Sequence, residues 1–169
     1  MSIFTPPVET LHDLYISELR DLYSAETQLI EALPKMARAS TSNDLKHALK
    51  SHLEETKNHA GRLMTIFNSL GENPTGKTSK SMQALIKEGE DYVGSGASEA
   101  VRDAALISAA QRVEHYEIAA YGTVRSLAIE LQEHDAAELL QQTLNEEAAA
   151  DKKLTVIAED RVNALAKQA

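Results

Sequence analysis

The spacing of apolar residues predicts a chain built from long α-helices. In the first part of the chain, apolar or aromatic side chains recur at steps of three and four, which is the period of one helix face. We therefore expect a first long helix that ends near Arg38. A bend or an early end is expected at Pro34, because a proline inside a helix removes a backbone hydrogen bond. The residues of this stripe are Leu11, Tyr15, Leu19, Leu22, Leu29, Leu33 and Met36.

A second stripe follows the turn-forming residues 40–43 and predicts a second helix that stops at Gly71. Residues 71–98 contain two Gly-rich breaks around a short amphipathic helix near residues 81–93. This connection is long for neighbouring antiparallel helices, so we interpret it as a crossover along a bundle. The second stripe consists of Leu45, Leu49, Leu53, Ala60, Leu63, Phe67 and Leu70.

Two more long helices are expected after the crossover, one from about Glu99 and one after a break near residues 132–135. The sequence thus predicts a single all-α domain over residues 1–169, an antiparallel four-helix bundle with hairpins 8–70 and 99–166. The stripes of these last helices are Leu106, Ala110, Val113, Ala120, Val124, Leu127 and Leu131, and then Ala136, Leu140, Leu144, Leu154 and Ala158.

Composition narrows the function classes. A formal charge of −9 without a basic patch argues against a nucleic-acid partner, because such binding depends on clustered Lys and Arg. The chain has no Cys, which excludes disulfides and zinc-thiolate sites. No apolar run is long enough to span a membrane, and the first residues do not resemble a signal peptide. We therefore expect a cytoplasmic protein with no membrane partner.

Each predicted helix carries acidic residues on or beside its apolar face. In two helices joined by a tight antiparallel turn, residues at equal distances from the turn lie at the same height. By this count, the acids of the first and second helices lie opposite each other, as do those of the third and fourth. Asp151 falls opposite the region of Glu114 by the same count. The candidate residues are Glu26 in the first helix, Glu55 and His59 in the second, Glu114 and Glu117 in the third, and Glu147 and Asp151 in the fourth.

Several carboxylates around one bundle axis would repel one another unless a multivalent cation neutralised them. Carboxylates with one or two imidazoles favour iron or manganese over copper. For any one of these residues the alternative is a helix-edge acid in water or in a pair with Lys or Arg. The arrangement on four core-facing surfaces favours the metal site. His115 lies on a different helix face from Glu114 and Glu117, and we interpret it as an outer-face residue.

Four segments carry a resemblance to a known family. The segments "DLYSAETQL", "HLEETKNH", "VRDAALISAAQRVEHYEIAAYGT" and "TLNEEAAADKKL" resemble those of the YciE/YciF-type ferritin-like family of bacterial stress-response proteins. The resemblance spans about residues 8–165. It implies a ferritin-like bundle with an extra helix in the crossover, a cytoplasmic location and a homodimer.

The resemblance also implies a ligand plan for two metal ions. Glu26 corresponds to the first-helix ligand and Glu55 to the second-helix bridging acid, while Glu114 and Glu117 resemble the Glu-x-x-Glu pair of rubrerythrin and Glu147 is the fourth-helix acid. The broad ferritin-like pattern has His three residues after Glu. Here His59 and Asp151 each follow four residues after the acid, a spacing that still shares a helix face.

Two functional hypotheses follow. The first is a non-haem dimetal oxidase or peroxidase that holds two Fe or Mn ions, bridged by Glu55 and Glu147, and acts on peroxide or dioxygen. Tyr23 and Tyr121 are candidates to hydrogen-bond the acids. The second is a non-catalytic helical bundle that acts through dimerisation or partner binding, with the metal site weak or empty. Iron storage as a mineral is less favoured because the sequence gives no sign of a cage.

Overall fold

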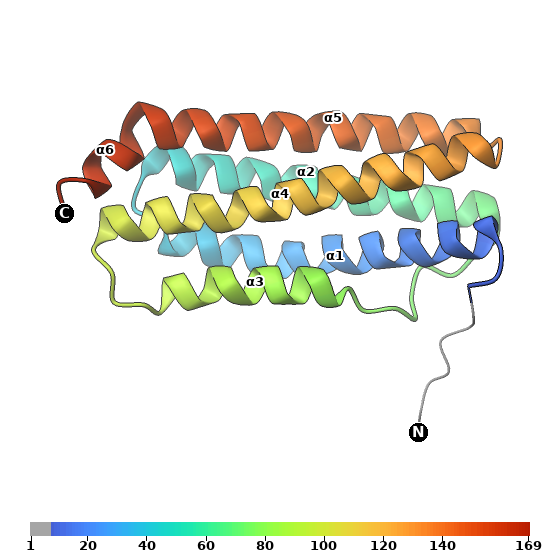
Figure 1. Cartoon of the computed structure of the whole chain (residues 1–169), viewed down its shortest axis with the longest axis horizontal. Coiled ribbons are helices and arrows are strands. Elements are labelled where there is room, and N and C mark those ends of the chain that lie inside the picture. The colour runs from blue at the N-terminus through green and yellow to red at the C-terminus, as the bar shows by residue number, and fades with distance from the viewer. Residues whose placement is uncertain (1–7) are drawn as a thin grey trace, which may run out of the picture.

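Four long helices lie side by side in the computed structural model, which describes residues 8–169 (Figure 1). They are α1 (Leu11–Ala39), α2 (Asn43–Leu70), α4 (Glu99–Glu130) and α5 (His134–Ile157). Helix α1 packs mainly against α2, and α4 against α5, so that two antiparallel hairpins form the bundle. Residues 8–169 contain no strand. The predicted all-α four-helix bundle is confirmed.

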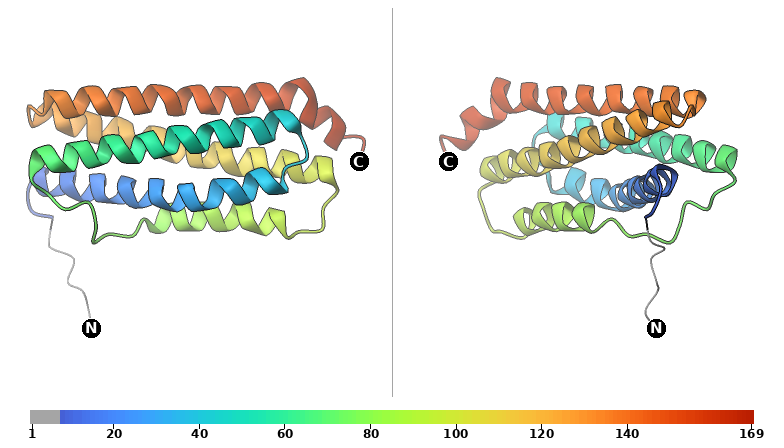
Figure 2. Two further views of the ribbon diagram at one scale, coloured as in Figure 1. Left: turned by 180° about the vertical axis from the view of Figure 1, so that it is seen from behind. Right: turned by 45° about the vertical axis from the view of Figure 1, so that its right-hand side comes forward.

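The connection between the hairpins runs along the bundle, as predicted. Its short helix, α3 (Lys80–Val93), packs against α1 and α4 (Figure 2). Ser79 fixes the start of α3, since its hydroxyl accepts a hydrogen bond from the backbone N–H of Met82 and donates one to Asp21. Gln28 of α1 donates to the carbonyl of Ser79 at 3.1 Å. These contacts hold the crossover against the first hairpin.

Turn and capping residues set the ends of the long helices. Thr10 and Asp13 form a capping box at the start of α1, and Ser42 caps α2 by accepting from Leu45 N–H. Helix α2 stops at Gly71, whose φ of 67° lies in the left-handed region that glycine enters without steric cost. The turn between α4 and α5 places Gln132 in the same region, at φ 63°.

The turn between α1 and α2 is tied to the second hairpin by a buried acid. The Asp103 carboxylate, on α4, accepts hydrogen bonds from the backbone N–H groups of Thr41 at 2.9 Å and Ser42 at 2.6 Å, and from the Thr41 hydroxyl. This contact satisfies the backbone donors of the α2 N-cap and of the residue before it, which the helix itself leaves without a partner.

Pro34 does not end the first helix. Helix α1 continues through Pro34 to Ala39, so the predicted alternative of an early end is wrong. Proline lacks one backbone donor, and the packing of Leu33, Met36 and Ala37 in the core keeps the last turn helical in spite of this loss.

The fourth helix is extended beyond α5. A π-helical turn, Ala158–Val162, leads into the short helix α6 (Asn163–Ala166). Val162 is buried in the core, and the end of the chain lies beside the turn that joins α1 and α2 (Figure 1).

The interior consists of two apolar clusters. One is centred on Leu29, Leu33, Leu49, Leu106 and Leu154. The other is centred on Leu19, Leu63, Phe67, Val124 and Leu140. Along α1, two buried residues lie between Leu22 of one cluster and Leu29 of the other: Ala25 and the polar residue Glu26. Among the described residues, no helix is both long and apolar enough to cross a membrane.

Candidate metal centre

A layer of buried polar side chains separates the two apolar clusters, and all four long helices contribute to it. Each of these side chains belongs to a residue that is at most 6% exposed. Their positions follow from the helix stripes, because each lies three or four residues from another buried residue of its own helix. The residues of this polar layer are Glu26 on α1, His52 and His59 on α2, Glu114 and Glu117 on α4, and Glu147 on α5.

The polar layer contains two groups that have the composition of metal sites. In each group, one donor atom per residue lies within 4.8 Å of every other. Glu147 belongs to both groups, and its two oxygens lie near different histidines: Oε1 is 2.9 Å from His59 Nδ1 and Oε2 is 3.9 Å from His52 Nε2. The first group is His52, Glu114, Glu117 and Glu147, and the second is Glu26, His59 and Glu147.

Most donor atoms of the layer lack a hydrogen-bond partner within the described chain. Both oxygens of Glu117 and of Glu147 are buried without one. His59 Nδ1 lies 2.9 Å from Glu147 Oε1, and His52 Nε2 lies 3.3 Å from Glu114 Oε1, at ion-pair distances but without hydrogen-bond geometry. Unsatisfied buried polar atoms are rare in folded proteins and require an explanation.

Burial and mutual repulsion change the protonation of the acids. Burial raises the pKa of Glu26, and raises those of Glu114 and Glu117 well above the ordinary value for Glu. The charge of Glu147 raises all three further. Without a cation, burial and the charge of Glu147 therefore favour the protonated form of each of these acids more than in an exposed Glu.

The pKa values of the two histidines are also raised, but for a histidine this favours the charged form. Burial disfavours the charged form of each ring, but the neighbouring carboxylates outweigh this effect. They raise the pKa of His52 to about 9 and that of His59 to about 10. Protonated histidines thus neutralise part of the negative charge of the metal-free layer.

A second set of contacts orients the layer from outside. His59 Nε2 lies 2.8 Å from Glu146 Oε2, and Arg62 donates two hydrogen bonds to the same carboxylate, at 2.6 and 2.9 Å. The hydrogen bond from Arg62 holds the pKa of Glu146 below its ordinary value. A carboxylate on the outer nitrogen of a histidine fixes the ring so that the other nitrogen can ligate. Tyr121 of α4 donates a hydrogen bond to Glu26 Oε1.

Five of the seven predicted ligand residues come together in the polar layer: Glu26, His59, Glu114, Glu117 and Glu147. Glu55 does not join them, because its side chain is 41% exposed at the edge of α2 and contacts His52 Nδ1 at 3.4 Å. The structure therefore gives Glu55 no bridging position. Side chains tilt toward the N-terminus of their own helix, so in an antiparallel pair Glu26 meets a residue farther from the turn than equal counting suggests. That residue is His59, one turn beyond Glu55.

Asp151 also lies outside both groups. Its Oδ1 accepts a hydrogen bond from Gln111 at 3.1 Å and lies 3.3 Å from His115 Nε2. Asp151 was predicted to lie level with the region of Glu114, and its contacts with Gln111 and His115 place it at about that level. Its side chain lies on the outer side of the contact between α4 and α5. His115 has a side chain that is 70% exposed, which confirms its interpretation as an outer-face residue.

His52 is a member of the layer that the sequence reasoning missed. The buried face of α2 runs through a strict alternation of steps of four and three, and two of its positions are histidines. The predicted stripe followed Leu53 and Ala60, which are only half-buried, and so it placed His59 at the edge and passed over His52. The alternation itself was the available signal: Leu45, Leu49, His52, Thr56, His59, Leu63 and Ile66.

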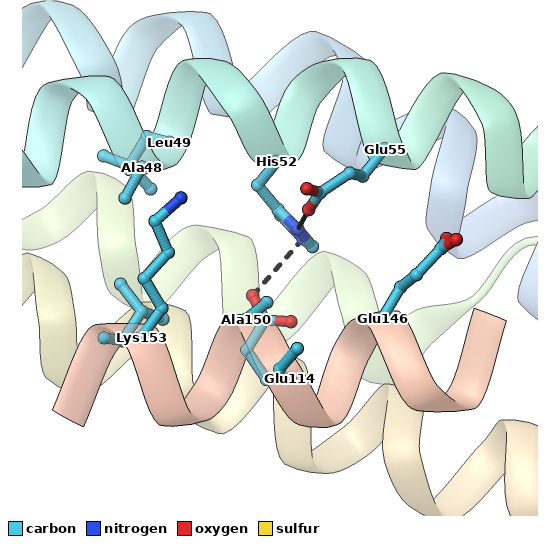
Figure 3. Close-up of a pocket in the computed structure, with 10 residues that line it drawn as sticks. Ala48, Leu49, His52, Glu55, Glu114, Glu146, Ala150 and Lys153 are labelled. Carbon is cyan, nitrogen blue, oxygen red and sulfur yellow. Dashed lines mark hydrogen bonds and ion pairs between the residues drawn. The ribbon is translucent and has the colours of Figure 1, made fainter. Parts of the chain in front are cut away.

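A pocket between α2 and α5 leads to one end of the polar layer. It has a volume of about 270 Å³, and His52 and Glu114 line it together with apolar residues of both helices (Figure 3). The dashed line in Figure 3 joins His52 to Glu114. The first metal-capable group can therefore be approached from solvent through this pocket.

The donor set has the composition of a site that could hold a metal ion. Carboxylate oxygens and imidazole nitrogens form a hard to borderline set, and the unsatisfied oxygens of Glu117 and Glu147 are the atoms that a cation would satisfy. An antiparallel four-helix bundle with such a layer defines the class of ferritin-like helical bundles. Comparison with known proteins narrows this class.

Residues 10–167 match a family described as a domain of unknown function (DUF892). The chain is 46% identical over 158 residues to protein YciF of Escherichia coli strain K12, a match that covers 92% of this chain and 95% of YciF. The chain therefore belongs to this family of YciF-type proteins.

Solved structures agree with this assignment. The crystal structure of the E. coli stress protein YciF matches with a TM-score of 0.89 and 44% identity, over 92% of this chain and 99% of YciF. YcfI from Rhodopseudomonas palustris, to which a structural role has been ascribed, matches with a TM-score of 0.86 and 44% identity, over 90% of this chain and 98% of YcfI. A protein from Xanthomonas campestris shares the fold alone, at 18% identity and a TM-score of 0.75.

Proposed function

We propose that this YciF-type stress protein binds two iron or manganese ions in the polar layer and acts on peroxide or dioxygen. The observation that carries the proposal is the buried set of unsatisfied donor atoms in two groups that share Glu147. Maintaining four buried carboxylates without a cation costs free energy. A pair of divalent ions would offset this cost.

We derive the proposed ligands from the two groups. Glu26, His59 and Glu147 would hold one ion, and Glu147 would also hold the second ion together with His52, Glu114 and Glu117. Compared with the sequence-based plan, Glu147 keeps its bridging role, and His52 takes the place that Glu55 had on α2. When bound, such ions supply electrons to peroxide or dioxygen and stabilise charge on oxygen.

The chain itself contributes three functions to this site. The apolar clusters on both sides keep solvent away from Glu26, Glu117 and Glu147, which are all 0% exposed. Glu146 and Arg62 hold the His59 ring with Nδ1 toward Glu26 and Glu147. The Tyr121 hydroxyl keeps a proton beside Glu26, since burial raises its pKa well above the ordinary value.

Metal content after reconstitution tests the proposal. Metal-free protein is incubated with Fe(II) without oxygen, or with Mn(II), desalted, and analysed by mass spectrometry for bound metal, after which peroxide consumption is measured. We expect two equivalents in the parent protein. Because Glu147 belongs to both groups, Glu147→Gln is expected to lose both equivalents, whereas Glu138→Gln, at an exposed position of the same helix, is expected to retain both.

Two results would contradict the proposal. One is the absence of bound metal together with an unchanged melting temperature after Fe(II) or Mn(II) is added. The other is equal metal content in Glu147→Gln and Glu138→Gln. If metal is bound but neither peroxide nor dioxygen is turned over, the proposed metal site is supported and the proposed activity is contradicted.

A second candidate function is a structural one, in which the bundle associates as a homodimer and the layer stays without metal. YcfI, at 44% identity, has been ascribed a structural role. The raised pKa values of His52 and His59 also favour it, because protonated rings neutralise part of the layer without any ion. Light scattering with size-exclusion chromatography tests the dimer: a stable dimer that is indifferent to metal supports this candidate, and a monomer contradicts it.

A further inference from the structure

The pocket between α2 and α5 ends on two residues of the polar layer. His52 and Glu114 line it and are 6% and 2% exposed, and within residues 8–169 neither His52 Nε2 nor Glu114 Oε2 has a hydrogen-bond partner. The pocket volume of about 270 Å³ is several times the roughly 30 Å³ that one water occupies in the liquid, so a cation can enter with part of its hydration shell. The inner end of the pocket therefore offers two buried donor atoms to an arriving cation.

The other residues of the polar layer lie deeper. They are all 0% exposed, and none of them lines this pocket: Glu26, His59, Glu117 and Glu147. The first metal-capable group contains both His52 and Glu114, whereas the second group consists only of fully buried residues. A cation that comes through the pocket therefore meets the first group before the second.

Glu55 is the acid of this pocket whose carboxylate is least engaged. Its side chain is 41% exposed, and its two hydrogen bonds within residues 8–169, with Ser51 and His52, are long, at 3.5 and 3.4 Å. The Glu146 carboxylate, by contrast, accepts two hydrogen bonds from the Arg62 guanidinium. The Glu55 oxygens are thus the more accessible to a cation from solvent.

Lys153 is the positive group of this pocket. It is exposed, and Figure 3 shows it on the opposite side of His52 from Glu55. Its charge opposes the approach of a cation, whereas the charge of Glu55 favours it. Both residues lie outside the two metal-capable groups, so they can change the rate at which ions arrive without being ligands of the bound ions.

We infer that divalent cations reach the polar layer through this pocket by way of Glu55, and that they fill the first metal-capable group before the second. An exposed carboxylate with weak contacts can take up a divalent cation through its oxygens and pass it inward to His52 and Glu114. The inference rests on the proposed metal centre, and it gives Glu55 a part in uptake. Because Glu55 belongs to neither group, its loss should slow binding and release together and leave the final metal content unchanged.

The kinetics of Mn(II) uptake test this route. Metal-free protein is rapidly mixed with Mn(II), a chelator is added at set times, and bound metal is measured by mass spectrometry after desalting. Glu55→Gln is expected to slow uptake about threefold and Lys153→Gln to accelerate it about threefold, because a single exposed charge contributes modestly. Glu54→Gln, at the adjacent exposed position outside the pocket, is the matched control and is expected to keep the parent rate. All three variants are expected to reach two equivalents.

A second pair of variants tests the pocket itself. Ala150→Leu narrows the pocket and is expected to slow uptake at least as much as Glu55→Gln, whereas Ala148→Leu, exposed on the same helix and outside the pocket, is expected to keep the parent rate. Circular dichroism checks folding. If Ala150→Leu does not fold, the charge variants on the surface still decide the question.

Two ligand variants test the order of filling. Glu26→Gln removes a ligand of the second group alone, so it is expected to retain one equivalent that is taken up at the initial rate of the parent protein. Glu117→Gln removes a ligand of the first group alone and is expected to slow the filling of both groups, because ions pass through the first. Slower initial uptake in Glu26→Gln than in Glu117→Gln would overturn this order.

The outcomes separate this inference from the proposed function. Equal uptake rates in Glu55→Gln and Glu54→Gln, with two equivalents bound, overturn the route and leave the metal centre intact. A final content below two equivalents in Glu55→Gln makes Glu55 part of the centre and also overturns the route. If the parent protein binds no Mn(II), the metal centre is contradicted and the route with it.

Discussion

In the metal-free fold, the carboxylate of Glu117 has no hydrogen bond within residues 8–169 to offset the cost of its burial. Both of its carboxylate oxygens are buried without a hydrogen bond, and its pKa is raised first by burial and then by Glu147, Glu26 and Glu114. In metal-free protein, we expect Glu117→Gln to raise the free energy of unfolding by about 1–2 kcal/mol, because it removes a buried acid from repulsion. In the presence of Mn(II), the same variant should lose affinity for metal. Urea unfolding and metal titration measure the two effects.

Glu130→Gln is the matched control for this prediction, since Glu130 is an exposed acid on the same helix. It should change neither quantity. If Glu117→Gln instead destabilised the metal-free protein, the acid would be a structural group with a favourable partner, and its assignment as a ligand would be wrong.

Glu146 provides a prediction about orientation. It lies outside the polar layer, and its Oε2 is 2.8 Å from Nε2 of the His59 ring. We expect Glu146→Gln to weaken metal binding about 10- to 100-fold, as is usual when the carboxylate behind a ligating histidine is lost. Titration with Mn(II) measures this change. Glu138→Gln serves again as the control, and equal affinities in the two variants would remove the orienting role.

The burial of the acidic residues was easier to predict from the sequence than the burial of the histidines. Glu26, Glu117 and Glu147 interrupt apolar stripes of Leu and Ala, so their burial was readable from the pattern. His52 was missed because a histidine does not mark a core position, and its stripe was drawn through neighbouring residues. The outward positions of Glu55 and Asp151 depend on contacts with His52 and Gln111, which no spacing along the chain reveals.

Helix α2 contains two glycines for which the same substitution should have opposite effects. Gly61 lies inside the helix, and a Cβ built there meets nothing within 4 Å. Gly61→Ala is therefore expected to stabilise the protein by about 0.5–1 kcal/mol, because alanine loses less backbone entropy in a helix. Gly71 ends the helix at φ 67°, and Gly71→Ala should destabilise it by about 1 kcal/mol, since a Cβ is strained in the left-handed region.

Thermal unfolding of the two single variants beside the parent protein tests this pair. Each variant is the control for the other, because both add one methyl group to the same helix. Two shifts of the same sign would contradict the assigned roles of Gly61 and Gly71.

The arrangement of elements was largely predictable. Stripes of three- and four-residue steps gave the four long helices, and the Gly-rich breaks gave the crossover with its short helix. Two features were not predictable from local pattern. Helix α1 tolerates Pro34 because tertiary packing outweighs the lost hydrogen bond, and the π-helical turn Ala158–Val162 has no residue type that marks it.

The metal-free molecule as a whole should lose stability as the pH rises. His52 and His59 have pKa values of about 9 and about 10 in the fold, above the ordinary 6.5. Their contribution is fully present below pH 6.5 and is lost as the pH rises through those two values. Glu26, Glu114 and Glu117 also have raised pKa values, so they add a loss of the same sign as they ionise.

Melting temperatures measured across this pH window test the prediction. We expect the melting temperature of metal-free protein to fall from pH 6.5 to about pH 10. Saturating Mn(II) should flatten the decline, because cation binding requires deprotonated ligands and so grows stronger with pH. A metal-free protein whose stability rises with pH in this window would contradict the protonation states described here.

The polar layer also helps to fix the axial register of the four long helices. Sliding any one long helix along its neighbours by a single turn, about 5.4 Å, would move its carboxylate or imidazole into one of the apolar clusters and bring leucines against the remaining acids. An uncompensated buried charge costs several kcal/mol, so every slipped arrangement is penalised. Apolar stripes alone would tolerate such slippage much better. We therefore expect that replacing all six polar residues with Leu or Met would yield a more stable bundle with several coexisting alignments, visible as multiple sets of NMR signals.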